Sequence, residues 1–436
     1  MTPMAASAAA IGAARSGDGA APATAGRSRM AFVSPMFLFP ANTGGRIRTT
    51  NILGGLHGGA FEVTLVGPGS PADRDRWRSE LDGICDHFVP WQPARPRPLW
   101  ARAVDLPRAL PINVVTDRTR PAQAAVEAVL AKRAFDVVVF DFVHAAVLLP
   151  RAYAGATVCF THNVEAEIFA RHAEQAKNPL MRLVWASQHE KMRRFERTAL
   201  QRFTSVVAVS ERDARHLAEH CGITAPITIP TGVDLDYFSW QAPAAEGGGK
   251  APTVVFIGSM DWAANIDGVR HFIDEVWPLV RREEPQARFV VVGRDPPASL
   301  RALAHATSGI SFTGFVDDVR PYVRAAHVCT IPLRIGGGTR IKAFEAMAMG
   351  CPVVSTSIGI EGLEVRDGDH FLKRDLATEQ AAAIVGLLRD RAWRDRLSRH
   401  ARDCVEQRFG HRVAARAFEH ACQTAMAVHA ARRGSV

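Results

Sequence analysis

The sequence predicts an α/β protein made of two doubly wound domains, and three observations lead to that prediction. Short apolar runs that end in polar residues alternate with amphipathic segments of helical length in both halves of the chain. A stretch rich in Gly, Pro and Ala, SWQAPAAEGGGKAP, separates the two halves. In the second half, a triple glycine joins an apolar run to a helical segment. We therefore expect two parallel sheets, each covered by its own helices.

The first domain is expected to begin with a strand at Met30 and a helix that opens near Gly44 and Gly45. Buried strands should follow at residues 137–140 and 157–160. Ser210 is an expected helix N-cap, with Asp213 three residues later. Residues 68–115 are rich in Pro, Arg and Trp, and we expect them to be irregular apart from a short strand near 86–90.

Polar side chains follow two of these strands directly. The strand at 137–140 ends in Asp141, with His144 close behind it, and the strand at 157–160 leads to His162. Ligands bind at the carboxyl ends of strands in an open α/β sheet. Asp141, His144 and His162 are therefore candidate ligand-binding residues at this edge of the first domain. A packing or capping role is the alternative for each histidine.

Residues 171–203 are expected to be largely helical, with a break at Pro179. Their cations outnumber their acids, and Leu180, Met181, Leu183 and Trp185 lie between them. Such a segment could rest on an anionic lipid surface. The alternative is an ordinary helix with a solvated basic face.

The second domain should open with a strand at 253–260 and continue with a strand at 288–294. Residues 309–333 should then supply a strand, a turn, a helix and a further strand. A helix should run from Arg340 to Met349, where Gly350 ends it, and further helices should cover 378–408 and 411–433. The predicted organisation is a disordered tail at 1–28, a first domain at 29–238, a linker at 239–252, a second domain at 253–408 and a terminal helix and tail at 409–436.

The triple glycine marks an expected phosphate site. Glycines leave the backbone N–H groups of Gly337 and Gly338 open to a ligand, and a helix N-terminus favours an anion. Thr339, Arg340 and Lys342 lie in the first turn of that helix, where cations are unfavourable unless a strong anion sits between them. Glu345 lies one turn further on, where it could accept hydrogen bonds from sugar hydroxyls. The alternative is a basic surface turn without a ligand.

Composition limits the classes of partner. The chain has 436 residues, of which 47% are hydrophobic, and a formal net charge of +9. This suits two hydrophobic cores and an anionic partner such as a nucleotide or lipid phosphate. Nucleic acid is not expected, because no recognition motif or aromatic and basic platform is present. The seven scattered cysteines predict buried thiols in a reducing compartment, and no apolar run reaches the ~20 residues of a membrane span.

The run GGGTRIKAFEAMAMGCPVVS resembles the donor-site signature of the glycosyltransferase family 4-like (group 1) enzymes, which are retaining nucleotide-sugar transferases with a GT-B fold. The phrase IPTGVDLDYF resembles the junction between the two domains of that family. The chain also departs from the family pattern. The commonest members carry two acids eight residues apart; here the first position is Gly337, and only Glu345 remains.

The resemblance implies a cleft between the domains and a last helix that crosses back onto the first. It implies that Gly44 and Gly45 face the donor phosphates, with Gly337, Gly338, Thr339, Arg340 and Lys342 on the other side. Gly258, Phe315, Val316 and Glu345 would meet the base and ribose. The irregular region at 68–115 could line the acceptor side, and the alternative is a packed loop on the surface. His162 and Asp141, with Glu345, would be the catalytic residues. In this family the leaving phosphate can itself take the acceptor proton.

The implied activity is retaining hexosyl transfer from a UDP or GDP sugar to a lipid-linked or glycan acceptor in cell-envelope or exopolysaccharide synthesis. No metal or other cofactor is expected, because no Asp-x-Asp pair is placed at a strand end to hold a metal beside the diphosphate. The expected location is the cytoplasm, with peripheral contact to the inner face of the membrane. The alternatives are a non-catalytic nucleotide-sugar-binding subunit of a polysaccharide assembly complex and a sugar-nucleotide epimerase. The sequence does not name the sugar, the base or the acceptor.

Overall fold

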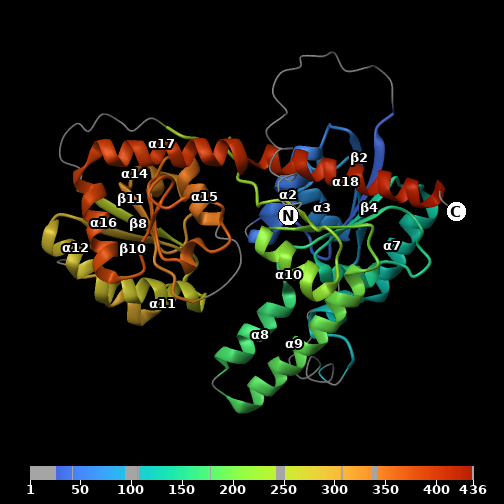
Figure 1. The fold of residues 1–436 in the computed structure, drawn as a ribbon, viewed down its shortest axis with the longest axis horizontal. Helices are drawn as coiled ribbons and strands as arrows, with labels where there is room; N and C mark the ends of the chain where they lie inside the picture. Colours follow the sequence, from blue (N-terminus) through green and yellow to red (C-terminus); the bar gives the residue numbers. More distant parts are fainter. Residues whose placement is uncertain are drawn as a thin grey trace, which may run out of the picture.

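The computed structural model describes residues 26–41, 43–93, 106, 108–176, 178–241, 251–305, 308–335 and 341–434. They form two lobes, each built on a parallel sheet, and Figure 1 shows the C-terminal helix starting between the lobes and lying over the N-terminal lobe. The predicted α/β class with two doubly wound domains is confirmed. Within the predicted tail, Arg27 already forms an ion pair with Asp86, and the first strand starts at Ser28.

The N-terminal lobe has a seven-stranded sheet in the order β3-β2-β1-β4-β5-β6-β7, in which every neighbouring pair is parallel. Its strands are β1 (Ser28–Val33), β2 (Phe61–Pro68), β3 (His87–Trp91), β4 (Val137–Asp141), β5 (Thr157–Phe160), β6 (Ser205–Ala208) and β7 (Ile227–Thr228).

These strands are apolar on both faces because helices cover both faces. In β1, Met30 and Phe32 enter one core cluster, whereas Ala31 and Val33 enter the other. Successive side chains of a strand point to opposite faces, so a continuous apolar run fills two cores at once. The sheet order reverses direction between β1 and β4. That switch point is where an α/β sheet opens a crevice for ligands.

Short helices surround this sheet, several of them with local caps. Ser210 Oγ accepts a hydrogen bond from the Asp213 N–H at 3.1 Å, as predicted, and Pro179 begins a helix behind the cap of Asn178. The helices are α2 (Gly44–Leu56), α3 (Pro71–Arg76), α4 (Arg78–Asp82), α6 (Ile112–Asp117), α7 (Arg120–Lys132), the 3-10 helix η1 (Val143–Leu148), α8 (Glu165–Gln175), α9 (Pro179–Leu200) and α10 (Glu211–Cys221).

The expectation that residues 68–115 are irregular is wrong in part. β3 forms where a short strand was predicted, but α3, α4 and the start of α6 also lie in this range. Ser70 and Asp73 form a reciprocal capping box at the start of α3, with Pro71 in the first turn. Such short helices lack the several turns of periodicity that would reveal them in the sequence.

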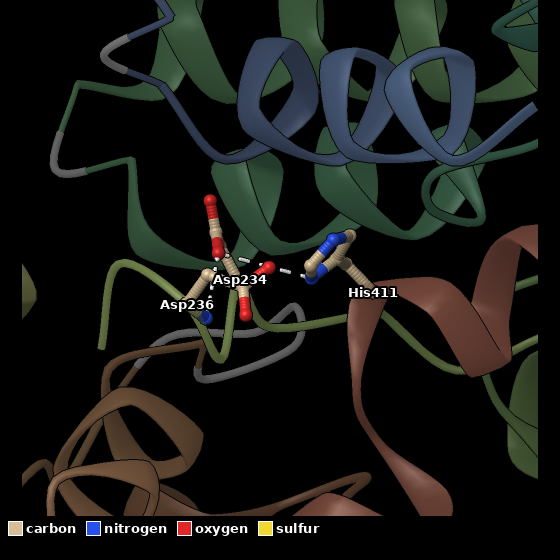
Figure 2. Close-up of side chains that lie close together, drawn as sticks. All are labelled: Asp234, Asp236 and His411. Atoms are coloured by element: carbon tan, nitrogen blue, oxygen red, sulfur yellow. Dashed lines mark hydrogen bonds and ion pairs between the residues drawn. The ribbon is translucent and has the colours of Figure 1, made fainter. Parts of the chain in front are cut away.

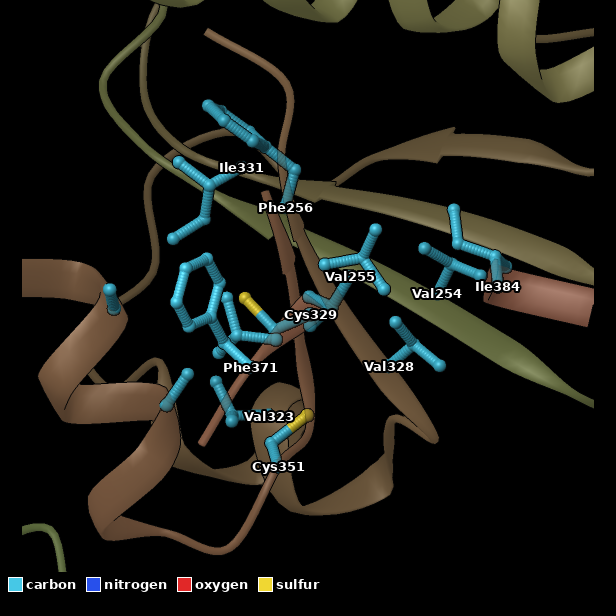
Figure 3. Close-up of a cluster of buried hydrophobic side chains, with 14 of the residues drawn as sticks. Val254, Val255, Phe256, Val323, Val328, Cys329, Ile331, Cys351, Phe371 and Ile384 are labelled. Atoms are coloured by element: carbon cyan, nitrogen blue, oxygen red, sulfur yellow. The ribbon is translucent and has the colours of Figure 1, made fainter. Parts of the chain in front are cut away.

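The C-terminal lobe has a six-stranded parallel sheet in the order β10-β9-β8-β11-β12-β13. Figure 3 shows part of its core, with Val255, Phe256 and Cys329 of the central strands and Phe371 among the buried side chains. The strands are β8 (Thr253–Ile257), β9 (Arg288–Val292), β10 (Ile310–Phe312), β11 (Val328–Ile331), β12 (Val353–Ser355) and β13 (Leu372–Lys373).

The helices of this lobe are α11 (Ala263–His271), the π-helical turn η2 (Phe272–Val276), α12 (Trp277–Glu283), α13 (Ala298–Arg301), α14 (Arg320–Ala325), α15 (Ile341–Ala348), the 3-10 turn η3 (Ile358–Ile360), α16 (Ala377–Arg389) and α17 (Arg391–Arg408). α15 is the helix predicted to follow the triple glycine. Residues 336–340, which include its predicted start at Arg340, lie outside the described residues.

The last helix, α18 (His411–Gly434), crosses back onto the N-terminal lobe, as predicted. Phe418 packs against Phe32 and Phe160, with ring centroids 6.4 and 4.8 Å apart. α18 also approaches α2 so closely that a Cβ built on Gly55 would lie 2.3 Å from Ala415 Cβ. A helix that continues the second lobe therefore completes the core of the first.

All seven cysteines are buried and free, as predicted. None of the helices in the described ranges combines the length and the apolar character of a membrane span.

Candidate active site

The two lobes meet where α2 and α15 begin. A Cβ built on Gly44, the first residue of α2, would lie 3.5 Å from Ile341 Cδ1, the first residue of α15. The described starts of two helices thus lie close together across the lobe boundary, and a helix N-terminus carries a partial positive charge. Farther along the boundary, a pocket is lined by Asn163, Glu167 and Arg212 of the N-terminal lobe and by Glu361 and Gly362 of the other.

On the N-terminal side, Asp141 and His162 are bonded to each other. His162 Nε2 lies 2.7 Å from Asp141 Oδ1, and Asp141 is fully buried. Asp141 Oδ2 also accepts hydrogen bonds from Ser34 Oγ at 3.1 Å and from Thr49 Oγ1 at 3.0 Å. Because a carboxylate only accepts hydrogen bonds, His162 carries its proton on Nε2 and leaves Nδ1 as an acceptor. Asp141 therefore holds the imidazole in one tautomer and orientation.

Phe142 covers the face of this imidazole. Its ring stacks on His162 with centroids 3.8 Å apart and an interplanar angle of 9°. Phe142 has a φ of +67°, which is costly for an aromatic residue and is found mainly at functional sites. Gly45 allows this placement, since a Cβ there would lie 2.6 Å from Phe142 Cζ. The glycine pair of α2 is thus in direct contact with the histidine site.

Burial is the largest influence on the His162 charge. It lowers the pKa of His162, against the opposing effect of Asp141, so the imidazole is neutral at pH 7. Arg48 adds to this lowering from one side, where its guanidinium lies 4.4 Å from the Phe160 ring centroid and donates to the Ile229 carbonyl at 2.9 Å. Burial also lowers the pKa of Arg48, to about 9.

His144 is in a different environment. Its Nδ1 is hydrogen-bonded to Asp117 of α6, and its ring lies 5.1 Å from that of Phe142. Although burial works against the charged form, Asp117 and the nearby Glu165 raise the pKa of His144. Of the three N-terminal candidates, Asp141 and His162 form one unit. His144 belongs to a separate pair on the other side of Phe142.

On the C-terminal side, Lys342 reaches back from α15 to the end of β8. Its Nζ donates to Asn265 Oδ1 at 3.1 Å and lies 4.6 Å from the Phe256 ring centroid. A Cβ on Gly258 would lie only 3.0 Å from that Nζ and 2.7 Å from Asn265 Nδ2, so this position has no room for a larger side chain. Lys342 thereby places a cation beside the glycine that follows the first strand of the lobe.

Glu345 lies one turn beyond Lys342 on α15 and is half-buried. Burial raises the pKa of Glu345 to about 7, and Lys342 opposes this shift only in part. Its carboxyl group therefore changes charge near neutral pH. Strongly shifted acids of this kind occur often in functional sites, although structural ion-pair networks also produce them.

The remaining predicted donor residues divide into two groups. Gly337, Gly338, Thr339 and Arg340 lie outside the described residues. Phe315 and Val316 follow β10, next to Gly314, which bridges to Gly293 at the end of β9. The Phe315 side chain is 73% exposed, while Val316 is half-buried against the core of the lobe.

The sequence analysis missed two residues at this edge of the sheet. Asn265, which holds Lys342, is buried in α11. Arg294 follows β9 and bonds to Ser259 Oγ and Asp261 Oδ2, both at 2.9 Å. The signal for Arg294 was present, because a cation directly after a strand that ends in Gly293 lies at the ligand-binding edge.

Three possible metal ligands gather at the hinge, where the chain passes twice between the lobes. In the part of the chain that the structure describes, Asp234, Asp236 and His411 are the one such cluster, shown in Figure 2. Their polar atoms already have protein partners. Asp234 Oδ1 accepts the N–H of Asp236 at 3.0 Å, and Asp236 pairs with Arg412 at 2.8 Å. The contacts of this cluster connect the two crossing segments, with the Val233 and His411 backbones bonded at 2.8 Å.

Comparison with known proteins agrees with this geometry. Residues 43–237 match the family described as Glycosyltransferase Family 4, and residues 251–390 match Glycosyl transferases group 1. The two matches fall on the two lobes. The chain belongs to the glycosyltransferase family 4-like, group 1 glycosyltransferases.

Relatives of this family with curated descriptions are similar to the chain over part of its length. The phosphatidyl-myo-inositol mannosyltransferase of Mycobacterium leprae is 32% identical over 196 residues, which is 44% of this chain and 51% of that protein. The 2-deoxystreptamine glucosyltransferase of Streptomyces kanamyceticus is 30% identical over 195 residues, covering 39% and 47% of the two chains. The chain thus spans about half the length of the curated relatives it matches.

Solved structures of the same architecture cover nearly the whole chain. A sucrose-phosphate synthase from Thermosynechococcus elongatus has a TM-score of 0.67 at 19% identity, covering 92% of this chain and all of the other. HepE from Anabaena, solved with UDP and glucose, has a TM-score of 0.63 at 15% identity and covers 91% of this chain and all of its own. At these identities the similarity establishes the GT-B fold alone.

Proposed function

We propose that this chain is a retaining hexosyltransferase that moves a sugar from a nucleotide-sugar donor of the UDP or GDP type to a lipid-linked or glycan acceptor. The observation that carries the proposal is the meeting of α2 and α15 at Gly44 and Ile341, with His162 behind one helix start and Lys342 in the other. A neutral hydrogen-bonding group on one side of the lobe boundary and a cation on the other support a site for a sugar diphosphate between them.

In the proposed reaction the bond between the anomeric carbon and the diphosphate breaks while the acceptor oxygen bonds to the same face of that carbon. The acceptor proton passes to the departing phosphate oxygen, so no protein base is required. Negative charge grows on the diphosphate as it leaves. Lys342 and the N-termini of α2 and α15 would stabilise that charge, and fixed donors of this kind typically contribute about 10²–10³ in rate.

The remaining residues position the donor. His162 would accept a hydrogen bond from a sugar hydroxyl through Nδ1, while Asp141 holds the ring from behind. Glu345 would accept hydrogen bonds from sugar or ribose hydroxyls, and the turn at Phe315 and Val316 would contact the base. Gly337, Gly338, Thr339 and Arg340 remain predicted phosphate contacts.

We propose that this transfer needs no metal, because Lys342 and the predicted Arg340 supply positive charge where a metal would otherwise do so. We also propose that the enzyme works at the inner face of the cytoplasmic membrane, in cell-envelope or exopolysaccharide synthesis. The name of one relative, a phosphatidyl-myo-inositol mannosyltransferase, supports a lipid-linked acceptor.

A panel of UDP-, GDP-, ADP- and CDP-sugars in a thermal-shift assay tests the donor class directly. We expect one base to raise the melting temperature, and we expect release or transfer of that sugar to be insensitive to EDTA. Binding without turnover on any lipid-linked or glycan acceptor would support a non-catalytic nucleotide-sugar-binding subunit instead. No shift with any nucleotide sugar would contradict both.

A further inference from the structure

Arg48 is a buried cation inside the N-terminal lobe. The residue is only 3% exposed, although it lies in the second turn of α2, close to the start of the helix. Further along the same helix, the buried side chains are those of Ile52, Leu53 and Leu56, which are apolar. Taking a charge out of water is costly unless the protein pairs it well. Packing alone would therefore favour an apolar residue at this position.

The guanidinium group of Arg48 is held by main-chain oxygens and an aromatic ring. Nη1 donates to the Thr161 carbonyl at 3.2 Å, and Nη2 donates to the Ile229 carbonyl at 2.9 Å. The central carbon of the guanidinium lies 4.4 Å from the centroid of the Phe160 ring. Among the described residues, the buried Nε has no hydrogen-bond partner. These contacts fix the position of the cation and leave its charge in place.

The same contacts connect Arg48 to the histidine site. Thr161 directly precedes His162, so the bond from Nη1 holds the main chain from which the imidazole extends. The Phe160 ring also contacts that imidazole, with centroids 4.6 Å apart. Thr49, the next residue of α2, donates to Asp141 at 3.0 Å. Neighbouring residues of α2 thus hold both the main chain and the carboxylate on which His162 depends.

Charge balance gives the buried cation a further role. Burial lowers the pKa of Arg48 to about 9, which leaves the guanidinium charged at pH 7. Asp141, one of the two acids that act on it through space, is fully buried and bonded to His162. One buried cation and one buried carboxylate sum to zero, so a neutral imidazole keeps the whole group uncharged. A protonated imidazole would add an unbalanced charge in a region of low dielectric.

The other charged groups that face this cluster do not replace Arg48. Burial is the largest influence that lowers the pKa of His162, and Arg48 and His144 of η1 add to it. Asp213 of α10 is the second acid that acts on Arg48, and its carboxylate is paired with Arg212 at 3.3 Å. Without the buried guanidinium, a proton on the imidazole would be the nearest way to balance the carboxylate bonded to it.

We propose that Arg48 is a positioning residue for the sugar transfer. It fixes the main chain before His162 and balances the charge of Asp141, so that the imidazole meets the donor sugar as a neutral hydrogen-bond acceptor. This inference rests on the proposed function, in which His162 Nδ1 accepts a hydrogen bond from a sugar hydroxyl. A protonated Nδ1 would be a donor and could not do so. Arg48 acts through His162 and is not itself a catalytic residue.

A nitrogen-15 spectrum of the histidine side chains in the full chain, recorded from about pH 6 to 8, tests the charge state without turnover. The spectrum of His162→Gln identifies the His162 signals. We expect the wild-type imidazole to stay neutral with its proton on Nε2, and that of Arg48→Gln to titrate at least about one pH unit higher than in the wild type. Equal titrations overturn the proposal. So does a protonated wild-type imidazole at pH 7, which is decisive even if Arg48→Gln does not fold.

The pH dependence of turnover gives a second readout. In a Glu345→Gln background, which removes that carboxyl group from the profile, we expect Arg48→Gln to move the acid limb of kcat upward by about one pH unit at saturating donor. Arg48→Lys keeps a cation and loses the planar fork, so it should be slower but keep the acid limb of the parent. An acid limb that moves equally in both variants overturns the role of the charge.

Arg394→Gln is the matched control. Arg394 of α17 is also buried, in the other lobe, and it also donates to two carbonyl oxygens, those of Leu387 and Leu388, at 2.7 and 3.4 Å. We expect this variant to lose stability and to keep the pH profile of the parent. An equal movement of the profile would overturn the proposal, because it would follow from lost stability alone. If the wild type transfers no sugar while the His162 titrations differ as expected, the proposed function fails and the effect of Arg48 on His162 stands.

Discussion

The two sides of the cleft are built from the same parts and differ in how their polar groups are held. Both place a glycine and a helix start at the carboxyl edge of a parallel sheet. In the N-terminal lobe, Asp141 and His162 are buried, and Asp141 bonds to side chains from three other elements. In the C-terminal lobe, Lys342 and Glu345 are half-buried on the first turns of one helix. One side is prearranged by buried hydrogen bonds, and the other carries a cation and an acid that we propose meet the donor.

If the C-terminal side acts by charge, removing Lys342 should have the largest effect. We expect Lys342→Ala to lower turnover by about 10²–10³, since it removes a cation from the position where the leaving diphosphate becomes charged. Initial rates under saturating donor measure this. Arg270→Ala, a cation on α11 of the same lobe, is the control and should leave the rate nearly unchanged. Equal rates for Lys342→Ala and the wild type would place the phosphate elsewhere.

If Asp141 acts by orienting the His162 imidazole, it should affect turnover only through His162. We expect Asp141→Asn to lower kcat by about 10², because an amide can also donate a hydrogen bond and no longer fixes the proton on Nε2. His162→Ala should show a similar loss, and the double variant should be little slower than either single variant. Fully additive losses would show that Asp141 has a separate role. Circular dichroism of each variant checks that the buried pair has not unfolded the lobe.

The sequence alone predicted the strand ends and the helix that form the two sides of the cleft. The strand that ends in Asp141 and the strand before His162 are neighbours in the sheet, so the meeting of these residues follows from parallel-sheet geometry. Likewise, the apolar run, the glycines and the helical period predicted α15 and Lys342. These features are local in the chain, and periodicity reports local structure.

The partners of those residues could not be predicted in the same way. Ser34 and Thr49 lie 107 and 92 residues from Asp141, and Asn265 lies 77 residues from Lys342. Such pairs depend on how strands and helices pack in three dimensions, which no short spacing records. Phe142 is a further case, because an aromatic residue with positive φ has no sequence signature.

The glycine pair of α2 offers a matched test of preorganisation. A Cβ at position 45 would meet the Phe142 ring at 2.6 Å, whereas a Cβ at position 44 would make an ordinary contact with Ile341 at 3.5 Å. We expect Gly45→Ala to destabilise the protein by about 1–3 kcal/mol and to slow turnover by displacing the ring stacked on His162. Gly44→Ala shares the same gain in helix propensity and should leave folding stability nearly unchanged. Thermal melts that rank the two variants in the opposite order would contradict the assignment of Phe142.

Substitution of Glu345 should have the smallest effect of these changes, and its effect on donor affinity should depend on pH. Burial raises the pKa of Glu345 to about 7, so the carboxylate that we propose accepts hydrogen bonds from sugar hydroxyls becomes more populated as pH rises from about 6 to 8. Donor binding should therefore tighten over that range. Glu345→Gln keeps an acceptor of similar shape. We expect it to lower affinity by about fivefold at the upper pH and to remove most of the pH dependence. Isothermal titration with the preferred donor across this range measures both.

The pH dependence of the free energy of unfolding tests the Glu345 carboxyl group independently of donor binding. The folded-state pKa of Glu345 lies above its ordinary value of 4.5, so the folded protein binds more protons than the unfolded chain between those two values. The free energy of unfolding therefore includes a term that is present at about pH 4 and is lost as pH rises through about 7. Wild type should lose stability relative to Glu345→Gln over that interval. Parallel stability curves of the two proteins would show that Glu345 is solvated in the free protein. The difference between the two sides of the cleft would then depend on Lys342 alone.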